Sequence, residues 1–214
     1  MSANSMFGAA YTFSKAISYA DNSDSGLVWN WEPMWERNRA PASFDRTHNL
    51  QLFGSYDLPF GRGKQWAQTG IAGLLAGGWQ VNAIMSRLSG TPFTVATAGT
   101  SLNAPGNTQT ADQVVAEVRI PGGHGRGESY FDPNAFAPVA EVRFGNTGRN
   151  ILRGPGLFNL DASVFRNFRV SEQVTLQFRT EVFGATNTPQ FSGLTATNAT
   201  VSSATRNADG SIRR

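Results

Sequence analysis

The chain has 214 residues, no cysteine and a formal charge of +3 from 18 basic and 15 acidic side chains. The lack of cysteine excludes disulfide scaffolds, Cys-ligated zinc or iron–sulfur sites and thiol catalysis. The basic residues, nearly all Arg, are scattered along the chain, whereas a nucleic-acid-binding protein usually carries a basic stripe on one face, so nucleic acid is not an expected partner.

The start of the chain has neither a basic segment, nor an apolar segment, nor a cleavage site of the kind found in a signal peptide. Its first residues already have the pattern of a strand interior, which favours a fragment of a longer protein. The longest apolar run, IAGLLAG at 71–77, is far shorter than the roughly 18 residues of a membrane-spanning helix.

Strict alternation of apolar and polar residues predicts five strands. In chain order they are 7–13, 48–58, a strand that begins at Trp79, 158–164 and 174–182. With their flanks these strands are about 9 to 13 residues long, whereas strands in globular proteins are typically about 5–6. Because a tilted strand needs about 9–11 residues to cross a bilayer, the lengths suit membrane strands.

The two faces of these strands differ in polarity. One face is apolar, and we expect it to contact lipid through Phe7, Tyr11, Leu50, Leu52, Val81, Leu160, Val164, Leu176 and Phe178. The opposite face is polar, and we expect it to line a lumen through Asn49, Gln51, Gln80, Asn82, Asn159, Asp161, Gln177, Arg179 and Glu181. A soluble sandwich also alternates, with its polar face in water, so strand and connection lengths must decide between the two.

The connections between the strands alternate between long and short. Residues 18–47, 91–156 and 188–214 are long, while about 20 residues around LPFGRGKQW and a tight turn at 170–173 are the shorter connections. Loops beyond about 15 residues are rare in compact domains, but outer-membrane barrels alternate long extracellular loops with short periplasmic turns. We therefore expect an all-β fold: part of an antiparallel transmembrane β-barrel with about five meander strands.

Six stretches of the chain resemble the C-terminal barrel of TonB-dependent outer-membrane receptors of the Oar-like branch. They are YTFSKAIS (11–18), FDRTHNLQLFGSYDLPFGRGK (44–64), GGWQVNAIMSRLSGTPFTV (77–95), YFDPNAFAP (130–138), FGNTGRNILRGPGLFNLDASVFRNFRVSE (144–172) and LQFRTEVFGATNTPQF (176–191). They occur in the family's order and cover most of the chain. Each motif alone is weak, but the six in sequence are specific.

The resemblance implies that residues 1–214 are one fragment of such a barrel, without the plug, the N-terminal domain and the last strand. It implies a parent protein in the outer membrane of a Gram-negative-type bacterium that takes up a bulky nutrient or metal chelate. The implied partners are outer-membrane lipid and lipopolysaccharide, and TonB only through the missing N-terminal part.

Motifs for catalysis or cofactor binding are not convincing. Gly63 and Lys64 suggest a phosphate-binding loop, but Leu58 and Gln65 stand where the motif needs Gly and Ser or Thr. The glycine-rich stretch 121–127 is better explained as a flexible loop. The two histidines lie far apart in the sequence, and no G-x-S-x-G elbow occurs. We therefore expect no catalytic site, cofactor or metal, and no enzyme.

The first long connection carries five residues suited to binding a ligand, since binding residues concentrate on loops held by a rigid scaffold. They are Trp29, Trp31, Trp35, Arg37 and Arg39. The alternative is that they order the loop or meet lipopolysaccharide phosphates. Two other functions stay open: a surface binding or adhesion module that uses 18–47 and 91–156, and a soluble secreted β-sandwich.

The implied topology puts the last strand's end in the periplasm. Counting back, 18–47, 91–156 and 188–214 then lie outside the cell, where most of the arginines fall, and LPFGRGKQW lies in the periplasm. Five strands cannot close a barrel, because the smallest membrane barrels have about 8. We therefore expect the isolated chain to have two unpaired edges and to need detergent.

Overall fold

The structure is a computed structural model that describes residues 5–20, 27–100, 102–120 and 131–190. The glycine-rich stretch 121–127 and all of 188–214 beyond residue 190 lie outside the described residues. The chain divides into two compact units. Unit 1 is Met1–Phe13, His48–Leu88 and Leu157–Gln190, and unit 2 is Ser14–Thr47, Ser89–Gly156 and Phe191–Arg214.

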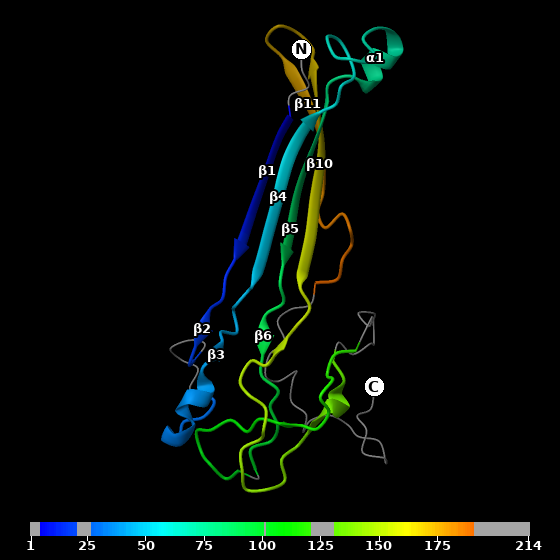
Figure 1. Cartoon of the computed structure of the whole chain (residues 1–214). Helices are drawn as coiled ribbons and strands as arrows, with labels where there is room; N and C mark the ends of the chain where they lie inside the picture. The colour runs from blue at the N-terminus through cyan, green and yellow to red at the C-terminus, as the bar shows by residue number, and fades with distance from the viewer. Residues whose placement is uncertain (1–4, 21–26, 101, 121–130, 191–214) are drawn as a thin grey trace. The chain divides into compact units, whose positions relative to one another are not determined.

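Unit 1 is built on a five-stranded antiparallel sheet. Its strands are β1 (Ser5–Phe13), β4 (His48–Asp57), β5 (Trp79–Leu88), β10 (Leu157–Arg169) and β11 (Thr175–Val182), and they lie in that order across the sheet (Figure 1). The five predicted strands and their meander order are confirmed. At 8 to 13 residues, the strands are close to the length of about 9–11 residues that crosses a bilayer.

The apolar face of the sheet is not covered. No described residue of unit 1 is a buried hydrophobic residue, and side chains such as Phe7, Tyr11, Leu176 and Phe178 are exposed. A soluble sandwich would bury these side chains against a second sheet. The sheet is therefore a single layer with an exposed apolar face, as in the wall of a membrane barrel, and the sandwich expectation is not supported.

Two glycine–aromatic pairs fit β1 against β4. Phe7 is directly opposite Gly54, and Gly8 is directly opposite Phe53. A Cβ atom on Gly54 would lie 2.7 Å from Cδ1 of Phe7, and one on Gly8 would overlap the Phe53 ring. Each aromatic ring thus covers the backbone of a glycine, one ring on each face of the sheet, which helps to fix the register of the pair.

The connections leave the sheet at alternating ends. Phe13 pairs with His48, and Leu88 with Leu157, so the two long connections 14–47 and 89–156 leave from the same end. Residues 58–78 and the turn 170–174 leave from the opposite end, and in the turn the N–H of Val170 donates to the carbonyl of Val174 at 3.0 Å.

The connection 58–78 contains a helix that the sequence analysis did not predict: α1 (Gly70–Ala76), at the same end of the sheet as the β10–β11 turn (Figure 1). No helix in the described ranges has the length and hydropathy needed to cross a membrane.

Unit 2 is not a set of unstructured loops. It contains the two-residue strand pairs β2 (Ile17–Ser18) with β3 (Ala40–Pro41), β6 (Pro92–Phe93) with β9 (Leu152–Arg153), and β7 (Asp112–Gln113) with β8 (Phe136–Ala137). Two 3-10 helices, η1 (Glu32–Asn38) and η2 (Pro133–Ala135), complete it. Its apolar core comprises Phe93, Val95, Ala111, Val118, Ala135 and Phe136, with Phe131 and Leu152 packed against them.

Candidate functional site

The polar face of the sheet brings together all nine residues that the sequence analysis assigned to a lumen. Residues directly opposite in an antiparallel pair share a face, and the strand register puts Asn49, Gln51, Gln80, Asn82, Asn159, Asp161, Gln177, Arg179 and Glu181 on one side. The nine residues assigned to lipid all lie on the other side. That the polar side lines a lumen stays a prediction.

Hydrogen bonds link the polar side chains across neighbouring strands. The Gln51 amide donates to Asn49 at 2.9 Å and accepts from the Ser86 hydroxyl at 2.5 Å. Gln80 donates to Asp57 at 3.1 Å. The Gln51–Asn49 bond lies within β4, whereas the Ser86–Gln51 and Gln80–Asp57 bonds join β4 to β5. Cross-strand contacts of this kind contribute roughly 0.2–1 kcal/mol each. Phe53 and Ile84, opposite each other on the same face, interrupt the polar groups.

The charged side chains on this face have ion-pair or hydrogen-bond partners within unit 1. Arg179 forms an ion pair with Glu181 and stacks over the Phe165 ring at 4.6 Å. Asp161 accepts the backbone N–H of Gly184 at 2.8 Å. Asn82 differs, since its amide nitrogen is shielded from solvent and has no hydrogen-bond partner among the described residues. It lies directly opposite Ser55 and Ser163 on the neighbouring strands.

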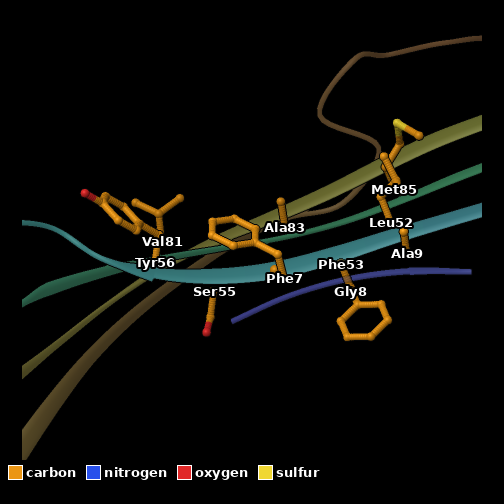
Figure 2. Close-up of a pocket in the computed structure, with 11 residues that line it drawn as sticks. Phe7, Gly8, Ala9, Leu52, Phe53, Ser55, Tyr56, Val81, Ala83 and Met85 are labelled. Atoms are coloured by element: carbon orange, nitrogen blue, oxygen red, sulfur yellow. The ribbon is translucent and has the colours of Figure 1, made fainter. Parts of the chain in front are cut away.

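β1, β4 and β5 form an apolar groove of about 520 Å³ whose lining lies mostly on the opposite face. Figure 2 shows Phe7, Leu52, Tyr56, Val81 and Met85 on one side of the sheet and Phe53 and Ser55 on the other. The groove has no charged residue in its lining. Its composition suits hydrocarbon chains and offers nothing to orient a polar substrate.

The five predicted ligand contacts of the first connection fall into two groups in unit 2. Trp29 has no exposed surface and lies beneath Arg37, whose guanidinium is 4.4 Å from the ring. Trp31, Trp35 and Arg39 are exposed, and Trp31 stacks on Phe144. Trp29 and Arg37 thus order the segment, whereas the exposed three are accessible. Ligand contact by the five stays a prediction.

Arginine side chains join distant segments of unit 2 through backbone carbonyls. Arg37 donates to the carbonyls of Gly145 and Thr147, the latter at 2.7 Å, and burial lowers the pKa of its guanidinium. Arg149, which is buried, donates to the carbonyls of Ser18 and Asn38 at 2.6 and 2.7 Å. These arginines therefore have a structural role in addition to their charge.

An ion pair between the buried Asp45 and the half-buried Arg153 lies shortly before β4 in the sequence. The Asp45 carboxylate has no exposed surface, pairs with Arg153 and accepts the Ala16 N–H at 2.6 Å. Burial alone would raise the pKa of Asp45, but the Ala16 N–H, the Arg153 guanidinium and the Thr47 hydroxyl outweigh it. The pKa of Asp45 is therefore held below its usual value.

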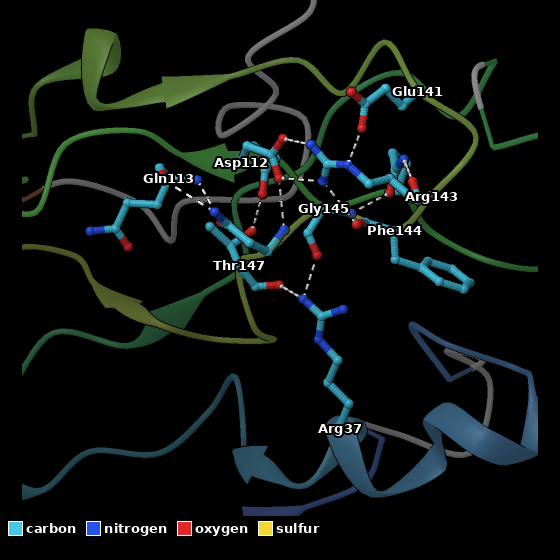
Figure 3. A network of polar contacts seen from close by, with 11 residues as sticks. Arg37, Asp112, Gln113, Glu141, Arg143, Phe144, Gly145 and Thr147 are labelled. Atoms are coloured by element: carbon cyan, nitrogen blue, oxygen red, sulfur yellow. Dashed lines mark hydrogen bonds and ion pairs between the residues drawn. The ribbon is translucent and has the colours of Figure 1, made fainter.

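A second network surrounds Asp112 (Figure 3). The Arg143 guanidinium donates to both carboxylate oxygens of Asp112, at 2.9 and 2.5 Å, and its Nε to Glu141 at 2.6 Å. The Asn146 N–H also donates to Asp112, at 2.8 Å. The hydrogen bonds from Arg143 lower the pKa of Asp112 despite partial burial, and the two carboxylates raise the pKa of Arg143.

Sequence reasoning missed these two networks. Glu141, Arg143 and Asn146 lie in a Gly- and Asn-rich stretch, 141–150, which has no alternation to analyse, and their partner Asp112 and the Asp45–Arg153 pair come from other irregular segments. The sequence shows only that Asp and Arg residues occur far apart along the chain, and this does not indicate which of them form ion pairs. Within the described ranges, no three His, Cys, Asp or Glu side chains are grouped closely enough to hold a metal ion.

Comparison with known proteins identifies the family of the chain. A family model described as an outer membrane beta barrel domain matches residues 1–214. No curated protein and no solved structure matches the chain.

Proposed function

The chain belongs to the outer membrane β-barrel domain family and is located in the outer membrane, and we propose that it forms part of the barrel of a TonB-dependent receptor of the Oar-like branch. The parent protein then takes up a bulky nutrient or metal chelate, and the chain itself catalyses no reaction. The six motifs of residues 11–191 support this branch. The plug and TonB-binding segments belong to the rest of the parent.

The observation that carries the proposal is the separation of the two faces of the sheet. The interior wall of an outer-membrane barrel is polar, and the lumen of a receptor that holds a plug needs such a wall, so a polar face on the sheet supports the proposal. Asn82 supports a role for this face, because a shielded amide donor without a protein partner has a free hydrogen bond for a water or another polar group.

The experiment that tests the proposal uses the full-length parent and the purified periplasmic domain of TonB. We expect the two to form a complex that is lost when the N-terminal segment of the parent is deleted. The 214-residue chain alone, which lacks that segment by this proposal, serves as the matched control and should not bind. Failure of the full-length parent to bind TonB would contradict TonB-dependent uptake.

A second function, surface binding or adhesion, is favoured by a different observation. Unit 2 is folded around its own core, and it presents Tyr19, Trp31, Trp35 and Phe44 as exposed aromatic side chains. Aromatic side chains are enriched at binding hot spots. If this function holds, replacing Trp31 and Trp35 by Ala in the parent should reduce attachment of cells to their surface or partner and leave TonB binding intact.

A further inference from the structure

Helix α1 carries an apolar stripe that no described residue covers. Ile71, Leu74 and Leu75 are 76, 69 and 64 % exposed. Their spacing of i, i+3 and i+4 puts the three side chains on one face of the helix. The remaining residues of α1 are Gly and Ala. An exposed stripe of three large aliphatic residues on a seven-residue helix has no role in folding the helix, because it buries nothing there.

The position of α1 is fixed by contacts to the apolar face of the sheet. Arg166 on β10 donates to the carbonyls of Leu74 and Leu75, the latter at 2.8 Å. The indole N–H of Trp79 on β5 also donates to the Leu75 carbonyl, at 2.9 Å. These bonds satisfy carbonyls at the C-terminal end of the helix that have no partner within it.

Arg166 and Trp79 belong to the lipid-facing side of the sheet. They are directly opposite each other, and Arg166 is also opposite Phe178 and two positions from Val164. The Arg166 guanidinium stacks on the Phe168 ring at 4.4 Å and is only 8 % exposed. A cation with carbonyl and aromatic partners at the end of a membrane strand is typical of the interface, where Arg and Trp side chains gather.

We propose that α1 is an interfacial anchor whose Ile71, Leu74 and Leu75 insert among the headgroups and upper acyl chains of the inner, phospholipid leaflet of the outer membrane. Arg166 and Trp79 lie on the lipid-facing side of the sheet and bind the backbone carbonyls of Leu74 and Leu75, so α1 is attached on the side of the sheet where we expect lipid. The same lipid is therefore the occupant we assign to the exposed stripe. The choice of leaflet rests on the proposed topology, in which residues 58–78 are periplasmic.

Composition and size agree with such an anchor. Interfacial helices insert their apolar side chains about 5–10 Å into the boundary between headgroups and acyl chains. Trp66, in the same connection, is exposed and its ring is 5.7 Å from that of Phe60, and the exposed Arg62 lies between them in sequence. Indole rings at headgroup level and cations near lipid phosphates both favour this position.

The test uses the full-length parent, in which every native cysteine is replaced, reconstituted in phosphatidylethanolamine–phosphatidylglycerol vesicles. An environment-sensitive fluorophore is attached to one introduced cysteine at a time. The reporter is Leu74→Cys, and Ile71→Cys is a second reporter should the first fold poorly. Ala72→Cys, on another side of the same helix, and Val142→Cys, exposed in the long connection 89–156, are matched controls. The quencher is a phospholipid with a nitroxide near its headgroup.

We expect the nitroxide lipid to quench the Leu74 and Ile71 reporters about threefold more strongly than the Val142 reporter, with Ala72 between, because the stripe lies about 5–10 Å deep. Equal, weak quenching at all four positions would overturn the proposal. A reporter that is shielded from water but not quenched by lipid would also overturn it, since the stripe would then be covered by protein, either another copy or a periplasmic partner.

The variant Arg166→Lys tests whether Arg166 holds α1 in position, as distinct from stabilising the sheet. A lysine cannot bridge two carbonyls while stacking on Phe168, because it lacks the planar fork of arginine. We expect quenching at Leu74 to fall toward the Ala72 value while a reporter at Val164 is unchanged. Unchanged quenching at Leu74 would show that Arg166 does not hold α1. None of these readings requires transport, so failure of TonB-dependent uptake leaves them unaffected.

Discussion

Gly145 is a position in unit 2 where backbone packing leaves no space for a side chain. A Cβ atom there would overlap the Thr110 carbonyl oxygen and lie 2.7 Å from that of Ala111. Because the obstacle is backbone, the clash cannot be relieved by rotating a side chain. The Gly145 carbonyl also accepts from Arg37, so a shift would strain that contact too.

We therefore predict that Gly145→Ala destabilises unit 2 by about 1–3 kcal/mol, the usual cost of overpacking. Gly99→Ala is the matched control, because no atom lies within 4 Å of the Cβ position there. Limited proteolysis of the two variants in the full-length protein is the measurement. Equal cleavage rates within residues 89–156 would contradict the packing described for Gly145.

The Asp45–Arg153 pair gives a pH dependence with a defined sign. The pKa of Asp45 is depressed in the folded protein, so its stabilisation is complete above the unfolded value of about 4 and is lost as the pH falls through the folded pKa. Below about pH 4, unit 2 should lose stability because the buried carboxylate becomes protonated and no longer pairs with Arg153.

Asp45→Asn should cost about 1–3 kcal/mol at neutral pH, since it leaves buried hydrogen-bonding groups imperfectly paired, and it should flatten the acid limb. Glu141→Gln is the control, because that carboxylate is largely exposed and exposed pairs contribute about 0–1 kcal/mol. Protease resistance of unit 2 measured from pH 3 to 7 compares the two. An acid limb that is unchanged in Asp45→Asn would show that other groups cause it.

At the scale of the element, β10 offers neighbouring positions on opposite faces at its middle. Val164 lies between Val81 and Thr180 on the apolar face, and Ser163 between Asn82 and Glu181 on the polar face. An arginine facing lipid at mid-membrane costs about 2–4 kcal/mol in a barrel, whereas an arginine facing a polar lumen is tolerated.

We predict that Val164→Arg destabilises the folded parent by about 2–4 kcal/mol, and that Ser163→Arg has little effect because Glu181 lies opposite. Urea unfolding in lipid vesicles is the measurement for both variants. Similar losses of stability in the two variants would mean that both faces of β10 are packed against protein. The interpretation of β10 as a strand of a barrel wall would then be wrong.

The five long strands were predictable from the sequence, but α1 was not. Alternation with period two identifies strands such as β4 and β5 because successive side chains point to opposite faces, one mainly apolar and the other mainly polar. The sequence of α1, GIAGLLA, has Gly at two of its seven positions, so its helix propensity is low. Its position depends on Arg166, far away in sequence, and no local pattern encodes such a contact.

The candidate sites also divide into residues that the sequence pattern predicts and residues that it does not. The nine polar residues of the sheet followed from alternation, since register carries each side chain to a fixed face. The burial of Trp29 beneath Arg37 and the pairing of Asp112 with Arg143 did not, because irregular backbone brings them together. For the same reason the 91–156 connection was expected as a long loop, whereas it folds around Phe93, Phe136 and their neighbours.

At the scale of the whole molecule, the proposed topology makes a prediction about protease access. Protease added to intact cells that express the parent should cleave within residues 91–156 and leave LPFGRGKQW (58–66) intact. Osmotically opened cells are the control, in which both segments meet the protease. Cleavage of 58–66 in intact cells would invert the topology and move α1 to the outer, lipopolysaccharide leaflet.

The central claim is that the sheet is a wall between lipid and a polar interior, and accessibility along β10 tests it most directly. Nitroxide labels are placed one at a time at residues 159 to 164 of the cysteine-free parent in vesicles. Oxygen concentrates in lipid, so we predict a high rate of collision between oxygen and the label at 160, 162 and 164 and a low rate at 159, 161 and 163. A polar nickel chelate, which stays in water, should show no such maxima at the even positions. Uniform accessibility along the strand, or oxygen maxima at the odd positions, would contradict the account.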